Sequence, residues 1–235
     1  MSPRDVVETL YVWTPFLAGG FVWNILVSLG AMAIGTALGA GLAVLRLSPR
    51  PVVARASVVV TSLTRNVPTF VFLFYLAFLI PPEVQLAGAS FVFPVWLKAS
   101  LALAIAVVGF VSDNLAEALR RWRAGDHVAA VMFVPNWTAY LVIILMASST
   151  ASVIGVGELV SRCNTVIASV GNDDLMLWIY LYAMLWFFTC CAVVQMAMRR
   201  VKLWIARGLP KAALTREAAS HVPELLARAE EQPTA

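Results

Sequence analysis

The sequence is poor in charge and in groups that bind metals. Only 13% of its 235 residues are charged, while 61% are hydrophobic. Soluble domains carry about a quarter charged residues, so an ordinary soluble domain is excluded, as are disorder and a disulfide-stapled secreted fold. Cys163, Cys190 and Cys191 lack metal-ligand spacing and His127 and His221 stand alone, so we expect packing cysteines and no metal site. The composition predicts an all-α integral membrane protein.

Sequence motifs that carry chemistry are also missing. There is no glycine-rich phosphate loop ending in Lys-Ser/Thr, no zinc pair and no nucleophile elbow. We therefore expect a non-catalytic chain that holds no cofactor and cannot hydrolyse ATP by itself. The formal net charge of +4 comes from short basic clusters between apolar runs, which is typical of topology signals and not of nucleic-acid binding.

Long apolar runs are abundant, and five of them are candidate membrane spans. They cover residues 16–45, 58–80, 95–111, 131–156 and 175–198. We expect loops at 81–94 and after 156, the latter with Glu158, Arg162, Asp173 and Asp174. The predicted division is an extracytoplasmic segment 1–15, a transmembrane domain 16–207 and a polar cytoplasmic tail 208–235, either a frayed amphipathic helix or disorder.

Basic residues are distributed unequally between the two predicted sides of the membrane. The rich side contains Arg46, Arg50, Arg55, Arg120, Arg121, Arg123, Arg199, Arg200, Lys202, Arg207, Lys211, Arg216 and Arg228. The poor side has Arg4, Lys98 and Arg162, with Arg65 unassigned. The positive-inside rule then predicts an N-terminus outside and a C-terminus in the cytoplasm, with Lys98 reaching toward the interface.

The first apolar run contains a stripe of small residues in its second half. Gly30, Gly35, Gly39 and Gly41 recur at near-helical spacing. Small residues at such intervals allow helices to approach closely in lipid, where packing drives association. We predict a packed inner helix.

Polar residues interrupt the apolar runs at three points, which are candidates for a transport pathway. They are Arg65 beside Pro68; Asp113, Asn114 and Glu117; and Ser148, Ser149 and Thr150. Each group has a structural alternative. Arg65 would only end a helix, the two carboxylates would pair with Arg120 and Arg121 at helical spacing, and the hydroxyls would bond neighbouring helices.

Four segments resemble a known family when taken in order. They are GGFVWNILVS at 19–28, RNVP at 65–68 before an aromatic-rich run, SDNLAEA at 112–118 and ASVIGVGEL at 151–159. The last is similar to the pattern L-A-S-V-I-G-V-x-E-L. Together they resemble the membrane permease subunits of bacterial ATP-binding-cassette (ABC) importers, in the polar amino-acid group, over residues 16–207.

The resemblance implies a function and a set of partners. Two permease subunits would enclose a pathway in the bacterial inner membrane for a polar amino acid or similar small solute. An ATPase subunit dimer carrying ATP and Mg²⁺ would drive transport, and an extracytoplasmic solute-binding protein would deliver the solute. Arg65, Asp113, Asn114, Glu117 and the 148–150 hydroxyls would line or border this pathway.

Departures from the family pattern concern the coupling to ATP. The family docks its ATPase through G-Q-x-E-A-A-x-x-L-G, and the matching residues here are Gly125, Asp126, His127, Ala129 and Ala130, without the Glu and the following Gly. The region is roughly twenty residues shorter than the pattern, and an alignment on Pro135 leaves no docking loop at all. Where the family has K-D-T-S-L, this sequence has MASST at 146–150, so both charges of the family's buried Lys–Asp ion pair are missing together. We therefore expect a heterodimer with a second permease, or alternatively a transport-inactive structural subunit.

Overall fold

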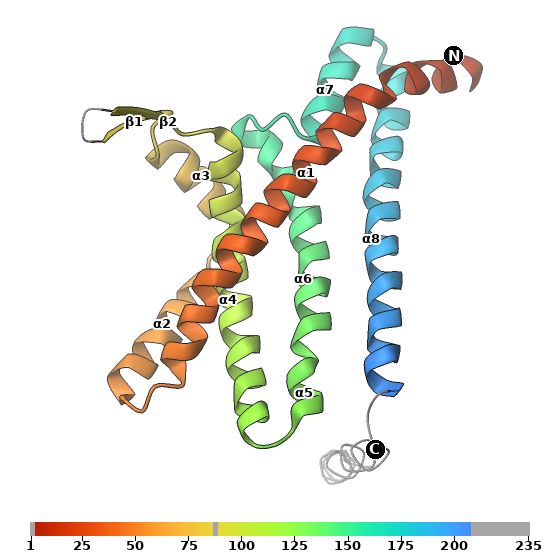
Figure 1. Cartoon of the computed structure of the whole chain (residues 1–235). Coiled ribbons are helices and arrows are strands. Elements are labelled where there is room, and N and C mark those ends of the chain that lie inside the picture. Colours follow the sequence, from red (N-terminus) through yellow and green to blue (C-terminus); the bar gives the residue numbers. More distant parts are fainter. Residues whose placement is uncertain (1–2, 87–88, 208–235) are drawn as a thin grey trace, which may run out of the picture.

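The computed structural model describes residues 3–86 and 89–207, which form a helical bundle with one small hairpin (Figure 1). The predicted tail 208–235, with Lys211, Arg216, His221 and Arg228, lies outside the described residues. The helices are α1 (Pro3–Arg46), α2 (Pro51–Asn66), α3 (Thr69–Leu79), α4 (Val95–Arg123), α5 (His127–Val131), α6 (Phe133–Ala147), α7 (Leu159–Val170) and α8 (Met176–Arg207). Two 3-10 helices, η1 (Ser148–Ile154) and η2 (Asp173–Leu175), and two strands, β1 (Glu83–Leu86) and β2 (Ala89–Val92), complete the described elements.

Four helical segments are long and apolar enough to cross a membrane. They are Arg4–Arg46, Val95–Arg123, His127–Ile154 and Met176–Trp204. The predicted second span is a pair, α2 and α3, bent by 94°. Pro68 lies at this break, where proline removes a backbone donor and disfavours helix in the residue before it. The prediction of an all-α bundle with five spans is thus confirmed, provided that the bent pair counts as one.

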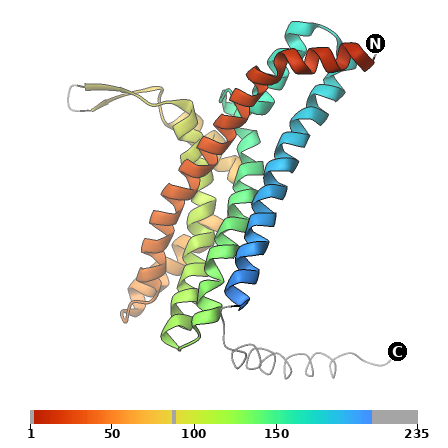
Figure 2. The same cartoon turned by 45° about the vertical axis from the view of Figure 1, so that its right-hand side comes forward.

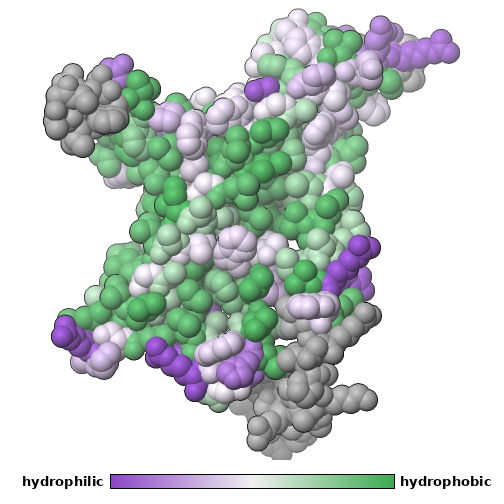
Figure 3. Space-filling model, viewed as in Figure 1, coloured by the Kyte–Doolittle hydropathy of each residue, from purple (hydrophilic) through white to green (hydrophobic). Residues whose placement is uncertain are grey.

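The surface of the bundle is that of a multi-pass membrane protein. Figure 3 shows a hydrophobic middle and hydrophilic side chains toward the two ends. The start of α1 and the end of α8 lie at opposite ends of the bundle (Figures 1 and 2). The ends of α1, α4 and α8 all carry basic residues and lie together, and we name this the basic end. Its assignment to the cytoplasm stays a prediction.

Helix α1 packs along α4 through three of the four predicted glycines. A Cβ on Gly35 or Gly39 would lie 2.7 Å or 2.8 Å from a backbone carbonyl oxygen of α4, and one on Gly30 would lie 3.1 Å from the Ser100 hydroxyl oxygen. Gly41 has no such neighbour within 4 Å. The packed inner helix is confirmed, but the fourth glycine is not part of the contact.

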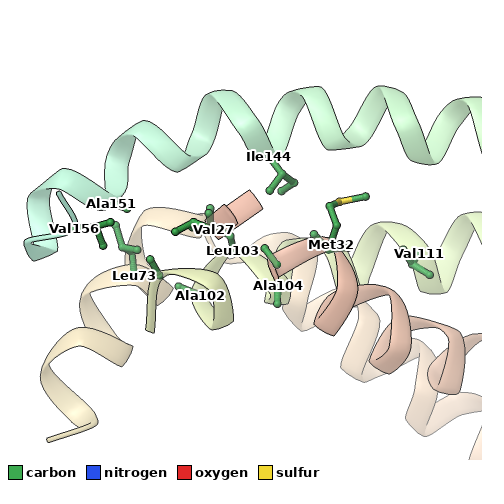
Figure 4. Close-up of a cluster of buried hydrophobic side chains, with 13 residues drawn as sticks. Val27, Met32, Leu73, Ala102, Leu103, Ala104, Val111, Ile144, Ala151 and Val156 are labelled. Carbon is green, nitrogen blue, oxygen red and sulfur yellow. The ribbon is translucent and has the colours of Figure 1, made fainter. Parts of the chain in front are cut away.

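A buried apolar cluster joins these helices to α3 and α6. Figure 4 shows Val27 and Met32 from α1, Leu103 from α4, Leu73 from α3 and Ile144 from α6. A second cluster joins the first half of α1 to α7 and the start of α8. Core packing therefore holds α8 at the end of the bundle opposite the basic end.

Two predicted loops contain regular structure. Residues 81–94 include the antiparallel pair β1–β2, with Glu83 opposite Val92, so a simple loop was the wrong prediction. The segment after 156 forms α7, whose first turn is capped by the Glu158 carboxylate and whose end is Gly171 at φ 63°. Short alternating or amphipathic segments such as these give a weaker signal than a span.

Candidate functional site

A polar cavity of about 310 Å³ lies where α2 ends, against α4 and α6. Its lining residues are Thr64, Arg65, Val67, Thr69, Ala106, Phe110, Asp113, Asn114 and Tyr140. Three predicted pathway residues, Arg65, Asp113 and Asn114, therefore come together here. The volume falls at the lower end of the roughly 300–1,000 Å³ that is usual for small-molecule sites.

The carboxylate of Asp113 bridges two arginines from different helices. Arg46 Nη1, at the end of α1, lies 2.5 Å from Asp113 Oδ1, and Arg65 Nη1, in the last turn of α2, pairs with Oδ2. The Arg46 side chain is 12% exposed and that of Arg65 is 62% exposed. Two guanidinium groups share one carboxylate, so the cluster carries a net positive charge.

The positively charged cluster also contains a hydrogen-bond donor that lacks an acceptor in the described part of the chain. Nε of Arg46 is buried and has no hydrogen-bond partner among the residues that the structure describes. A buried donor without a partner is unfavourable, and guanidinium groups suit carboxylate acceptors. Arg46 is not part of the cavity lining, so an anionic group in the cavity would meet the exposed Arg65 guanidinium instead.

The opposite wall of the cavity is aromatic and held in place by backbone contacts. The rings of Phe110 and Tyr140 stack with centroids 3.9 Å apart, and the Tyr140 hydroxyl donates to the Ala106 carbonyl oxygen at 3.2 Å. Asn114 Nδ2 donates to the Phe110 carbonyl oxygen at 2.9 Å. These contacts give the wall a defined shape.

Glu117 lies outside this lining, although it is one helical turn from Asp113. Its carboxylate accepts from Arg121 Nε at 3.0 Å and lies 3.7 Å from Arg120 Nη1. The structural alternative, pairing with the helix's own arginines, is confirmed for Glu117. It is wrong for Asp113, whose partners come from α1 and α2.

A second polar network lies in the interior, away from the cavity lining. Asn24 Nδ2 donates to Ser148 Oγ and to Glu158 Oε2, both at 2.9 Å, and Asn24 Oδ1 accepts from the Leu159 backbone N–H at 3.0 Å. Asn24, Ser148 and Glu158 are all 0% exposed. The network fastens α1 to η1 and to the start of α7.

Glu158 also caps α7, and its ionisation is shifted by its surroundings. Its carboxylate accepts from the backbone N–H groups of Val160 and Ser161 at 3.0 Å and 2.9 Å. Burial raises the pKa of Glu158, and the hydrogen bonds from the backbone and from Asn24 oppose that rise only in part. This end of the bundle therefore contains a carboxyl group whose pKa lies above its ordinary value.

The other two hydroxyls of the predicted 148–150 cluster bond to their own helix. Ser149 donates to the Met146 carbonyl oxygen at 2.8 Å and Thr150 to that of Ala147 at 2.7 Å. The structure thus does not bring this cluster to the cavity beside Arg65. Ser148 fits the predicted alternative of bonding between helices.

Comparison with known proteins identifies the architecture. No protein-family model and no curated protein matches the sequence. A solved structure described as "Crystal structure of an amino acid ABC transporter with histidines" superposes with a TM-score of 0.66, over 82% of this chain and 97% of that chain, at 16% identity. The two chains share a fold.

Four side chains of this chain were missed or misplaced in the sequence analysis. Asn24 was not proposed as a partner of Ser148 and Glu158, and Arg46 was not proposed as a partner of Asp113. Tyr140 was not proposed as part of the cavity wall. Asn24 had a usable signal, because a lone amide in a charge-free apolar run needs a buried partner. Lys98 was wrongly placed: it is 5% exposed and its Nζ donates to the Ile80 and Ala77 carbonyl oxygens at 2.5 Å and 3.4 Å, at the C-terminal end of α3.

The predicted docking loop forms a short turn and helix at the basic end. Gly125 has φ 85°, which favours glycine, and Asp126 Oδ1 caps α5 by accepting from the Ala129 N–H at 3.1 Å. The rings of His127 and Trp122 lie 4.4 Å apart, and Ala130 is buried. Among the described residues, no three His, Cys, Asp or Glu side chains come together to hold a metal ion.

Proposed function

We propose that this chain is a membrane permease subunit of an ATP-driven importer and forms half of the pathway for a polar amino acid or similar small solute. The observation that carries the proposal is the charged cavity of Arg65, Asp113 and Asn114 within an apolar bundle. The shared fold with a chain of an amino acid ABC transporter supports it. The charge composition of the cavity suits a solute that has both an anionic and a cationic group.

In the proposed mechanism, the solute's carboxylate binds Arg65 and its ammonium group approaches Asp113, both of which line the cavity. Helices α2 and α3 meet at the cavity with a break between them, so a change in their angle alters the cavity without unfolding either helix. Transport then requires two states that open to opposite sides, whose populations shift with ATP binding in a partner.

The proposed partners follow from the same assignment. A second permease completes the pathway, a separate ATPase dimer supplies ATP and Mg²⁺, and an extracytoplasmic solute-binding protein delivers the solute at the bacterial inner membrane. The turn and helix from Gly125 to Ala130 lie at the basic end, where we propose that an ATPase docks. Because this segment is short, we propose a heterodimer in which the second permease makes the larger contact with the ATPase.

The test is purification of the full chain in a mild detergent, identification of co-purifying subunits and reconstitution into proteoliposomes loaded with ATP. Uptake of labelled amino acids is compared between wild type, Asn114→Leu in the cavity and Asn136→Leu as a matched control. Asn136 is exposed on α6 and outside the cavity lining. We expect Asn114→Leu to lower uptake and Asn136→Leu to leave it unchanged.

The remaining outcomes separate the alternatives. Recovery of an ATPase and a second permease, with uptake that Asn114→Leu does not alter, would favour a transport-inactive structural subunit. Purification without any ATPase would overturn the importer proposal.

A further inference from the structure

A groove of about 690 Å³ lies between α6 and the second half of α8, toward the basic end. Ala139, Val142, Phe188 and Ala192 contribute to its apolar walls, and it ends at two cations, Arg199 and Lys202. The core cluster that includes α8 involves its first half, and the second half of α8 lines the groove together with α6. Figures 1 and 2 show α8 running alongside α6 toward this end of the bundle.

The two cations have no acidic partner in the described part of the chain. No ion pair found there involves Arg199 or Lys202, and neither α6 nor α8 contains an Asp or Glu. Both side chains are exposed. Two exposed cations at the end of an apolar groove suit an occupant that is anionic at one end and hydrocarbon along the rest.

The position of the groove matches the geometry of a lipid leaflet. Trp204, two residues beyond Lys202, is 75% exposed, and tryptophan is enriched at the level of lipid headgroups. Basic pockets between transmembrane helices bind anionic headgroups, while acyl chains fill apolar surface at membrane depth. We propose that this groove is a binding site for one anionic phospholipid, with its phosphate at Arg199 and Lys202 and an acyl chain between α6 and α8.

This proposal does not depend on transport, because its elements are the groove and its charges. A bound lipid would fill the groove between α6 and α8 and add to the contacts that hold the second half of α8 against the bundle. The site would thus couple the position of α8 to the lipid composition of the leaflet at the basic end.

The test measures lipid retention by native mass spectrometry on the full chain, purified with whatever partners it retains. Phosphatidylglycerol and phosphatidylcholine with identical acyl chains are added in turn. We expect retained phosphatidylglycerol in the wild type and a loss of roughly tenfold or more in Arg199→Gln/Lys202→Gln, since each basic residue near an anionic surface adds to the affinity. The matched control is Arg200→Gln, which removes an exposed charge from the same turn outside the groove lining.

A second pair of variants tests the hydrocarbon part without altering charge. Ala192→Phe fills the groove, whereas Ala197→Phe adds the same bulk at an exposed position outside the lining. We expect only Ala192→Phe to lower retention. Equal losses in Arg200→Gln and the double variant would overturn the proposal, as would equal retention of the two lipids. Loss of a co-purifying protein in Ala192→Phe, with phosphatidylglycerol unchanged, would identify a partner helix as the occupant and also overturn it.

Discussion

Arg46 and Asp113, 67 positions apart in the chain, form an ion pair with 2.5 Å between Nη1 and Oδ1. The pair joins the end of α1 to α4, and Arg65 adds the end of α2 through the other carboxylate oxygen. One carboxylate thus fixes the relative positions of three helices beside the candidate pathway.

Replacing Asp113 with Asn is expected to destabilise the protein. The substitution leaves the largely buried Arg46 guanidinium without its counter-charge, which typically destabilises by about 3 kcal/mol. Arg65→Gln is the matched variant: its side chain is 62% exposed, so we expect a loss below about 1 kcal/mol. Thermal unfolding in detergent measures both, and equal losses would contradict the assigned difference between the two ion pairs.

Replacing Lys98 with Met is expected to loosen α3. Lys98 Nζ donates to two carbonyl oxygens at the end of that helix, and losing such a donor typically destabilises by about 1–3 kcal/mol. Hydrogen–deuterium exchange of the α3 amides should accelerate in this variant. Arg55→Met, at an exposed position on α2, serves as the control and should leave α3 exchange unchanged.

Replacing Gly35 with Leu is expected to prevent folding, whereas Gly41→Leu should be tolerated. A side chain at Gly35 would overlap the Ala104 carbonyl oxygen, only 2.7 Å from the Cβ position, and backbone cannot rotate away. Gly41 has open space within 4 Å. Size-exclusion chromatography of the detergent-solubilised variants should show a single folded peak for Gly41→Leu alone. A folded Gly35→Leu would contradict the close approach of α1 and α4.

Glu158 is expected to make stability depend on pH. Its folded pKa is raised above its ordinary value of 4.5, so its favourable contribution is present below that value and is lost as pH rises through the folded pKa. Thermal stability should therefore fall more steeply as the pH rises above 4.5 in the wild type than in Glu158→Gln. The control is Glu117→Gln, which removes an exposed carboxylate. Parallel pH profiles for wild type and Glu158→Gln would contradict the shift.

Much of the bundle could be predicted because membrane insertion leaves strong signals in sequence. Long apolar runs mark spans, Pro68 marks the break between α2 and α3, and the glycines mark the contact between α1 and α4. These features depend on local composition, which a single sequence contains in full.

Partners across the bundle were harder to predict. Asn24 donates a hydrogen bond to Glu158, which is 134 positions away in the sequence. Lys98 of α4 reaches the end of α3, and the two helices lie side by side in the fold. Asp113 has arginines about two turns along its own helix, yet it pairs with Arg46 and Arg65. Opposite charge predicts that Asp113 pairs with an arginine. Which arginine it pairs with depends on where the helices cross, and a single sequence does not show this.

The glycine contact between α1 and α4 also has a consequence for motion. Where the backbone of α1 lies against that of α4, no side chain can change rotamer to let one helix slide past the other. The two helices therefore move as one rigid body. At the basic end, the ion pair of Arg46 and Asp113 joins α1 to α4. Beyond the other end of the glycine contact, the hydrogen bond from Asn24 to Glu158 joins α1 to the start of α7. A tilt of α1 and α4 that begins at the basic end is therefore passed to the start of α7 as a rigid rotation.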